Sequence, residues 1–194
     1  MGKGRVEAFS DGVLAIIITI MVLEMKVPHG TSINELKSLI PIFISYILSF
    51  IYIGIYWNNH HHMMHSIEHV NGKVLWANMH LLFWLSLIPF ATGWMGENHF
   101  ATLPVAVYGF VLLMCAVAYH ILARLLAHLH GKDSIIATAI GKDKKGKASV
   151  IIYTIAVCLC FIHPSIGIAL YTIVAAIWFI PDKRIEKKLE EEEK

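Results

Sequence analysis

The chain has 194 residues, of which 57% are hydrophobic and only 15% are charged, and its mean hydropathy is +0.62. Because an ordinary soluble domain carries about 25% charged residues, this composition indicates an integral membrane protein. The formal net charge is only +2, which argues against a protein that binds nucleic acid.

The first membrane-length segment begins with charged residues. Arg5 and Asp11 stand just before an almost entirely aliphatic run, from Gly12 to Leu23, in which Thr19 supplies a single hydroxyl. No small-residue cleavage site follows, so we expect a retained helix. A charged side chain at the centre of a membrane helix costs roughly 2.5 to 3.5 kcal/mol, and it normally persists only where it has a partner. Since six residues correspond to about 120° of rotation on a helix, Arg5 and Asp11 are expected to contact neighbouring helices and not each other.

Three further uncharged stretches are long enough for one helix each, since a helix needs about 20 apolar residues to cross a bilayer. These stretches lie between Lys37 and Glu68, between Lys73 and Glu97, and between Glu97 and Arg124.

The last apolar stretch holds thirty-four uncharged residues between Lys147 and Asp182 and is interrupted at Pro164. Proline lacks a backbone donor and disfavours helix at the preceding residue, so we predict two short helices at roughly 148–162 and 165–181. The predicted fold is therefore an all-α integral membrane domain of six transmembrane helices, residues 1–181, followed by a charged cytoplasmic tail, residues 182–194.

The distribution of basic residues predicts the orientation. With six spans and an inner N-terminus, fourteen Lys and Arg residues lie on the inner side, against only Lys26 and Lys37 outside. The positive-inside rule therefore favours a multi-pass protein of the cell membrane with both termini in the cytoplasm.

One face of the first helix is aliphatic apart from a glycine and a threonine. Residues three or four apart share a helix face, and this face carries Gly12, Ile16, Thr19, Ile20, Leu23 and Val27. Such a stripe can simply pack against lipid or another helix. If several copies of the helix gathered around an axis instead, Ile16, Ile20 and Leu23 would form hydrophobic rings and Thr19 a hydroxyl ring. Hydrophobic constrictions gate by dewetting, and oxygens replace part of the hydration shell of an ion.

The pattern Arg5, Phe9, Ser10 and Asp11, which leads into this helix, resembles the signature of the potassium channels of the transmembrane protein 175 family. The stretch Trp57-Asn58-Asn59-His60-His61 at the end of the second span extends the likeness. The resemblance implies a single six-helix repeat that assembles as a homotetramer with the first helix lining the pore. It also implies potassium and other monovalent cations as the permeant partners, without any cofactor.

The same resemblance implies roles for individual residues. Ile16 would form the hydrophobic constriction or gate, together with Ile20 and Leu23, and Thr19 would contribute to potassium selectivity. Channels of this family lack the TVGYG filter of ordinary potassium channels, and no such segment occurs in this sequence. We therefore expect modest discrimination of potassium over sodium.

For the signature residues Arg5, Phe9, Ser10 and Asp11 we expect a role in helix packing. Arg5, Ser10 and Asp11 would pin the first helix against the second and third spans, with His60, Asn78 and His80 as candidate partners. In this hypothesis they act in assembly more than in permeation.

Histidines are crowded near the end of the second span. His61, His65 and His69 recur every four residues, a spacing that places imidazoles on one helix face and could bind a transition metal or sense protons. No cysteine or paired carboxylate joins them, so we favour a polar helix end over a metal site.

A transporter and an intramembrane enzyme are the two alternative classes of function. Kinks at Pro41, Pro89 and Pro164 would suit a secondary cation or proton-coupled transporter, whose folds use broken helices around a midplane site. An intramembrane enzyme would need a nucleophile beside a base, and Ser45 and Ser49 have no evident activating neighbour. We therefore expect no enzymatic activity.

Overall fold

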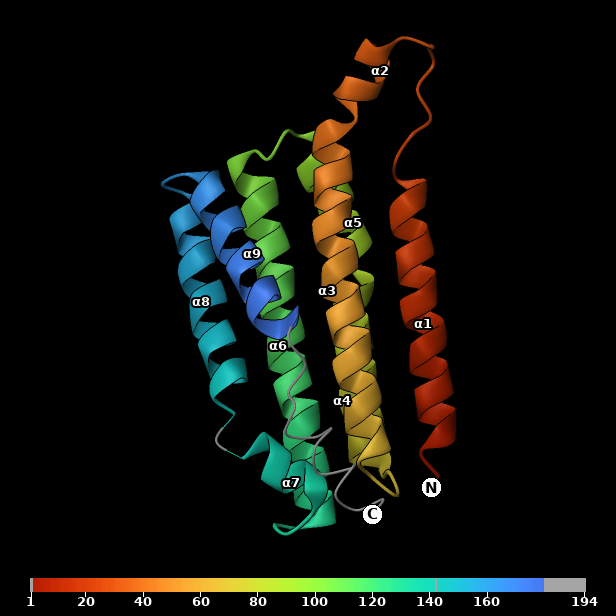
Figure 1. Cartoon of the computed structure of the whole chain (residues 1–194). Coiled ribbons are helices and arrows are strands. Elements are labelled where there is room, and N and C mark those ends of the chain that lie inside the picture. Colours follow the sequence, from red (N-terminus) through yellow and green to blue (C-terminus); the bar gives the residue numbers. More distant parts are fainter. Residues whose placement is uncertain (1, 142, 180–194) are drawn as a thin grey trace.

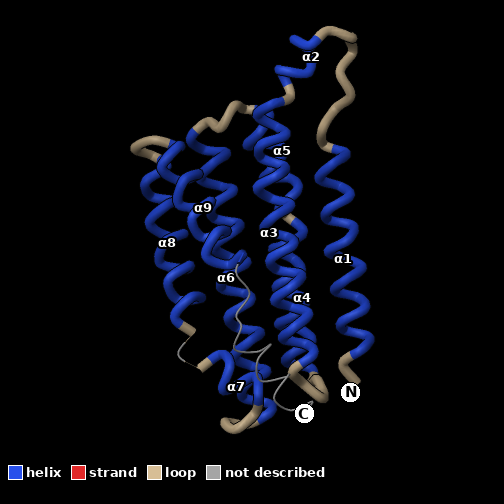
Figure 2. The backbone as a smooth tube through the Cα atoms, viewed as in Figure 1, coloured by secondary structure: helices blue, strands red, loops and turns tan. Residues whose placement is uncertain are grey.

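The computed structural model describes residues 2–141 and 143–179, and over these residues the chain is an elongated bundle of long helices (Figure 1). Loops lie mainly at the two ends of the bundle (Figure 2). The part of the chain described contains one isolated bridge, between Gly2 and His69, and no longer strand. Its helices are α1 (Gly4–Leu23), α2 (Ile33–Ser38), α3 (Ile40–His65), α4 (Gly72–Ser86), α5 (Ile88–Glu97), α6 (Thr102–His130), α7 (Ile135–Ile140), α8 (Lys144–Cys160) and α9 (Pro164–Phe179).

Four of the helical segments are long and apolar enough to cross a membrane: α1, α3, α4 together with α5, and α6. They correspond to the four single spans expected from the uncharged stretches. The third of these segments is interrupted at Leu87, between α4 and α5, two residues before Pro89. Since proline cannot donate a backbone hydrogen bond and its ring clashes with the preceding turn, Pro89 accounts for the interruption.

The predicted break in the last apolar stretch is confirmed. Helix α8 ends at Cys160 and α9 begins at Pro164. Proline is well tolerated at the first position of a helix, because a backbone N–H there would have no acceptor within the helix. The two helices pack closely, and a Cβ at Gly167 would overlap the Cys160 thiol. Both are shorter than a typical membrane crossing. The end of the second predicted helix and the whole predicted tail, residues 180–194, lie outside the described residues.

Helix α6 occupies the middle of the bundle, where it contacts α4, α5, α7, α8 and α9, whereas α1 lies at one edge against α3, α4 and α5 (Figure 1). Buried hydroxyl groups bond to one another across the helix crossings. Ser49 bonds to Thr92 at 2.6 Å and to Tyr108 at 3.0 Å, and the Tyr153 hydroxyl donates to that of Tyr52 at 3.1 Å. Because these hydroxyl groups bond to one another, none of them pays the free-energy cost of a buried polar group without a hydrogen bond.

Candidate functional site: the first helix

Helix α1 has two faces of opposite character. Its buried face is directed at α3, α4 and α5 and consists of Val6, Ser10, Leu14, Ile17 and Met21. Their spacing of three or four residues places them on one side of the helix. The single subunit therefore holds α1 along one stripe only and leaves the opposite stripe uncovered.

The residues predicted to line a pore are all exposed, and two of them, Ile16 and Ile20, border an open groove that α5 also lines. Ile16, Ile20 and Leu23 are 58%, 42% and 77% exposed, and Thr19 is exposed between them. Val27 was expected to continue the stripe, but this expectation is wrong because α1 ends at Leu23. Val27 directly precedes Pro28, and the residue before a proline is disfavoured in a helix.

Thr19 has a specific hydroxyl geometry. Its Oγ1 donates a hydrogen bond to the carbonyl oxygen of Ile16 at 2.9 Å. Because a hydroxyl has one proton and two lone pairs, this bond uses the proton and leaves the oxygen as an acceptor. The exposed stripe of α1 thus presents an oxygen with negative partial charge amid aliphatic side chains.

Ser10, on the buried face, takes part in a chain of hydrogen bonds that joins α1 to α4 and α3. Its Oγ donates to the carbonyl of Val6 at 2.8 Å and accepts from Asn78 Nδ2 at 2.9 Å. Asn78 Oδ1 lies 2.8 Å from His60 Nε2, and since an amide oxygen only accepts, the imidazole donates. The side chains of Ser10, Asn78 and His60 are all buried, so the chain of bonds is shielded from water.

Asp11 bonds to a residue that was not among its predicted partners. Its Oδ1 accepts a hydrogen bond from the indole Nε1 of Trp57 on α3 at 3.1 Å. Of the three predicted partners, Asn78 bonds directly to Ser10, and His60 bonds to Asn78. His80 does not contact α1 through a hydrogen bond and instead accepts one from Trp84 within α4. Trp57 is the first residue of the Trp-Asn-Asn-His-His stretch noted in the sequence. The sequence did not indicate that its side chain points toward α1.

Arg5 and Phe9 make no comparable contact within the subunit. Arg5 is exposed and forms no hydrogen bond or ion pair with any described residue, contrary to the expectation that it contacts a neighbouring helix. Phe9 is 52% exposed. The signature therefore divides into Ser10 and Asp11, which face α3 and α4, and Arg5 and Phe9, which face outward.

A further anchor at the N-terminal end of α1 was not predicted from the sequence. Lys3 Nζ donates to the carbonyl oxygens of Met64 and His65 at 2.9 and 3.0 Å. These carbonyls belong to the last turn of α3, where unsatisfied acceptors and the negative end of the helix dipole attract a cation. Glu7 also contacts α3, with its Oε1 3.5 Å from Nδ1 of His61.

The histidine stripe is only partly formed. His61 and His65 stack on α3 with ring centroids 6.1 Å apart, but α3 ends at His65, so His69 does not share their face. The His69 ring instead contacts that of His130 on α6, with centroids 4.7 Å apart and the planes tilted by 44°. Among the described residues, no three side chains of histidine, cysteine, aspartate or glutamate are grouped as a metal site would require.

The chain is similar to known proteins over nearly all of its length. The family model for the endosomal/lysosomal potassium channel TMEM175 matches residues 5–89, which run from the signature through α1, α3 and α4. A potassium channel of Chryseobacterium sp. (strain P1-3) is 56% identical over 191 residues, which cover 98% of this chain and 100% of the relative. This chain belongs to the TMEM175 family.

Other TMEM175 relatives match in sequence and in structure. A potassium channel of Chamaesiphon minutus is 31% identical over 91% of this chain and 92% of its own length. The crystal structure of a lysosomal potassium-selective channel TMEM175 homolog from Chamaesiphon minutus superposes with a TM-score of 0.82 at 28% identity, over 93% of this chain and 97% of that one. The human endosomal/lysosomal proton channel TMEM175 is 30% identical over 47% of this chain, which corresponds to 20% of the human protein. The family resemblance expected from the sequence is thereby confirmed.

Proposed function

We propose that this protein is the subunit of a potassium-permeable cation channel in which four copies surround a central axis and contribute α1 to the pore. The observation that carries the proposal is the uncovered aliphatic stripe of α1, formed by Ile16, Ile20 and Leu23. An aliphatic stripe alone would also suit lipid. The opposite face of the same helix, however, is held by buried polar bonds, which fix the direction in which the stripe points.

The stripe offers the two elements that a narrow cation pathway needs. Rings of Ile16, Ile20 and Leu23 would form a constriction that stays dry when the side chains close together, because water leaves narrow apolar pores. A ring of Thr19 hydroxyls would supply oxygens in place of part of the ion's hydration shell. The hydrogen bond from Thr19 to the Ile16 carbonyl supports this role, since it leaves the oxygen lone pairs available.

Ser10 and Asp11 would act as positioning residues for this helix. The hydrogen bonds that Ser10 accepts from Asn78 and Asp11 accepts from Trp57 tie α1 to two different helices, so α1 can neither rotate nor slide without breaking one of them. A pore whose radius depends on side-chain direction requires such a fixed rotation. Arg5 and Phe9, uncovered in the subunit, would be available to a neighbouring subunit.

In the membrane we propose that α8 and α9 complete six crossings, with both termini in the cytoplasm as the positive-inside rule indicates. Helices of 17 and 16 residues are short for a full bilayer. Local thinning of the bilayer around α8 and α9 would accommodate them at modest cost.

The test is ion flux through the purified protein. Full-length protein in liposomes loaded with potassium should release the ion down its gradient without any added cofactor, and mass measurement in detergent should give four subunits per particle. Empty liposomes and liposomes with an unrelated helical membrane protein serve as controls. A particle of one subunit, or an absence of potassium flux from correctly folded protein, would contradict the proposal.

Proton permeation is a second candidate, because the chicken and human relatives are named endosomal/lysosomal proton channels. The same liposomes with an enclosed pH indicator measure it directly. Transport by a carrier would differ from both, since carrier flux saturates at millimolar ion concentration and exchanges ions stoichiometrically.

A further inference from the structure

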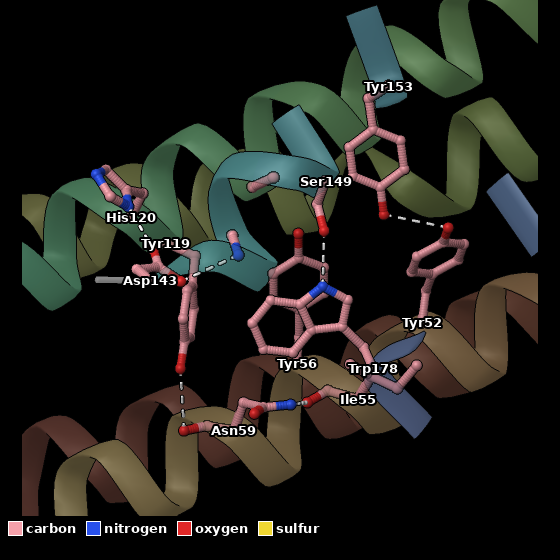
Figure 3. A pocket seen from close by; sticks show the side chains of 12 residues that line it. Tyr52, Ile55, Tyr56, Asn59, Tyr119, His120, Asp143, Ser149, Tyr153 and Trp178 are labelled. Carbon is pink, nitrogen blue, oxygen red and sulfur yellow. Dashed lines mark hydrogen bonds and ion pairs between the residues drawn. The ribbon is translucent and has the colours of Figure 1, made fainter. Parts of the chain in front are cut away.

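A cavity of about 50 Å³ lies inside the subunit, away from α1 (Figure 3). Its lining residues come from α3, α6, α8 and α9 and from Asp143, which directly precedes α8, and none of them belongs to α1. One ordered water needs about 10 to 15 Å³ on this measure, so the cavity has room for roughly four non-hydrogen atoms. The cavity is therefore large enough for a small ligand or the head of a larger one.

Three aromatic rings form walls of this cavity. Tyr56 and Tyr119 stand at 66° to each other with centroids 6.1 Å apart, and Tyr119 and Trp178 stand at 74° with centroids 6.4 Å apart. Rings that meet edge to face around a space expose π faces, and a cation within about 6 Å of such a face is attracted. Trp178 already attracts one cation, since Lys145 Nζ lies 5.9 Å from its ring centroid, although Lys145 is not among the lining residues.

A single carboxylate, that of Asp143, stands at one end of the cavity. Its Oδ2 lies 2.8 Å from Nδ1 of His120, and its Oδ1 accepts the backbone N–H of Gly146 at 3.0 Å (Figure 3). A carboxylate has about four lone-pair sites, so these two bonds leave acceptor capacity for another donor. The negative charge also disfavours an anionic ligand.

Two buried polar groups in the lining have unused hydrogen-bonding capacity. Tyr56 is 8% exposed, and its hydroxyl has no hydrogen-bond partner among the described residues. Asn59 is 9% exposed, and its Nδ2 donates to the Ile55 carbonyl at 2.8 Å while its Oδ1 accepts from no described residue. These two oxygens are not sealed from solvent, and each can accept a hydrogen bond from an occupant of the cavity.

We propose that this cavity binds a primary ammonium group, with Asp143 as the counter-charge and Tyr56, Tyr119 and Trp178 as an aromatic cage. A primary ammonium has three donors, and Asp143, Asn59 and Tyr56 each line the cavity with an oxygen that can accept a hydrogen bond. An ammonium with a carbon chain of two or three atoms also fits the available volume. The group can belong to a free alkylamine or to the ethanolammonium head of a lipid, since both carry the same chemistry.

The experiment measures propylammonium binding to the purified full-length protein in detergent by titration calorimetry, with 1-propanol as the neutral ligand of the same shape. We expect saturable binding of propylammonium and none of propanol. Asp143→Asn should weaken binding about tenfold or more, because it removes the charge from a charge-assisted hydrogen bond. It should still fold, since asparagine caps a helix about as well as aspartate.

Tyr56→Phe keeps the ring and removes only the hydroxyl, so it should weaken binding about threefold. The matched controls are Asp133→Asn, in the exposed loop before α7, and Tyr46→Phe, on α3 outside the cavity, and both should bind as the parent protein does. Equal binding of propanol and propylammonium, or full affinity in folded Asp143→Asn, would overturn the proposal. If Asp143→Asn failed to assemble, full affinity in Tyr56→Phe would overturn it equally.

Lipid nanodiscs distinguish the two sources of the ammonium. If the lipid head is the occupant, free propylammonium will bind more weakly in phosphatidylethanolamine nanodiscs than in phosphatidylcholine nanodiscs. Equal affinity in the two lipids assigns the site to free amines. The binding measurement needs no ion conduction, so its result is independent of the channel function proposed above.

Discussion

Asn78 donates a hydrogen bond from Nδ2 to Ser10 Oγ at 2.9 Å and thereby links α4 to α1 where both side chains are buried. The other end of the same amide, Oδ1, accepts from His60 on α3. One side chain therefore connects three helices, and the neighbouring hydrogen bond between Asp11 and Trp57 joins α1 to α3 a second time.

Replacing Asn78 by alanine should destabilise the protein. The substitution leaves the Ser10 hydroxyl and His60 Nε2 buried without these partners, and an unsatisfied buried group costs about 1 to 3 kcal/mol. We expect a lower melting temperature in detergent and a smaller fraction of assembled particles in size-exclusion chromatography. Asn34→Ala, at an exposed position on α2, is the matched control and should melt as the parent protein does. An unchanged melting temperature in Asn78→Ala would contradict a structural role for the amide.

Asp11 variants separate hydrogen bonding from charge. Asp11→Asn retains an oxygen that can accept from the Trp57 indole, so assembly and ion preference should stay close to those of the parent protein. Asp11→Ala removes the acceptor and should reduce the yield of assembled particles. The measurements are particle mass and the reversal potential with potassium and sodium on opposite sides. A correctly assembled Asp11→Asn protein with altered ion preference would place Asp11 in permeation and not in packing.

Ile16→Asn should raise basal potassium conductance. A polar side chain at a dry constriction favours water there, and a hydrated path conducts ions. Single-channel or liposome flux recordings measure the effect. The control is Ile155→Asn on α8, where the isoleucine is also exposed in the subunit but lies on a helix that does not contact α1. Equal conductance of the two variants would remove Ile16 from the pathway.

Thr19→Ala should weaken the discrimination between potassium and sodium, because it removes the oxygen proposed to replace part of the hydration shell. The reversal potential in mixed potassium and sodium solutions should move toward zero. Thr19→Ser retains the hydroxyl and its bond to the Ile16 carbonyl, so it should keep most of the discrimination. If Thr19→Ala and Thr19→Ser discriminate equally well, the hydroxyl has no role in selectivity.

Much of the helical order could be predicted from local features of the chain. The uncharged stretches predicted the four long apolar segments, and Pro164 predicted the break between α8 and α9. Val27 lies outside α1, which ends at Leu23, so its placement on the stripe of that helix was wrong. These features are local because hydrogen bonding within a helix and the conformational restriction by proline involve residues only a few positions apart.

The partners of the signature residues were less predictable. Asn78 was named as a candidate and bonds to Ser10, but Trp57 was not named for Asp11, and Lys3 was not expected on the last carbonyls of α3. Each of these contacts depends on how two helices are rotated and shifted relative to one another. A hydropathy pattern indicates which side of a helix is apolar but not which residue of a distant helix it meets.

The amino-acid sequence by itself determined the membrane class, the order of the apolar helices and the stripe of α1, because hydrophobicity, proline and helical spacing act over short distances along the chain. Only the tertiary structure decided which side of α1 is buried and that Tyr56, Tyr119, Asp143 and Trp178 surround one cavity. These residues come from α3, α6, α9 and the segment before α8, and their side chains meet because long helices pack at defined rotations that no local pattern specifies.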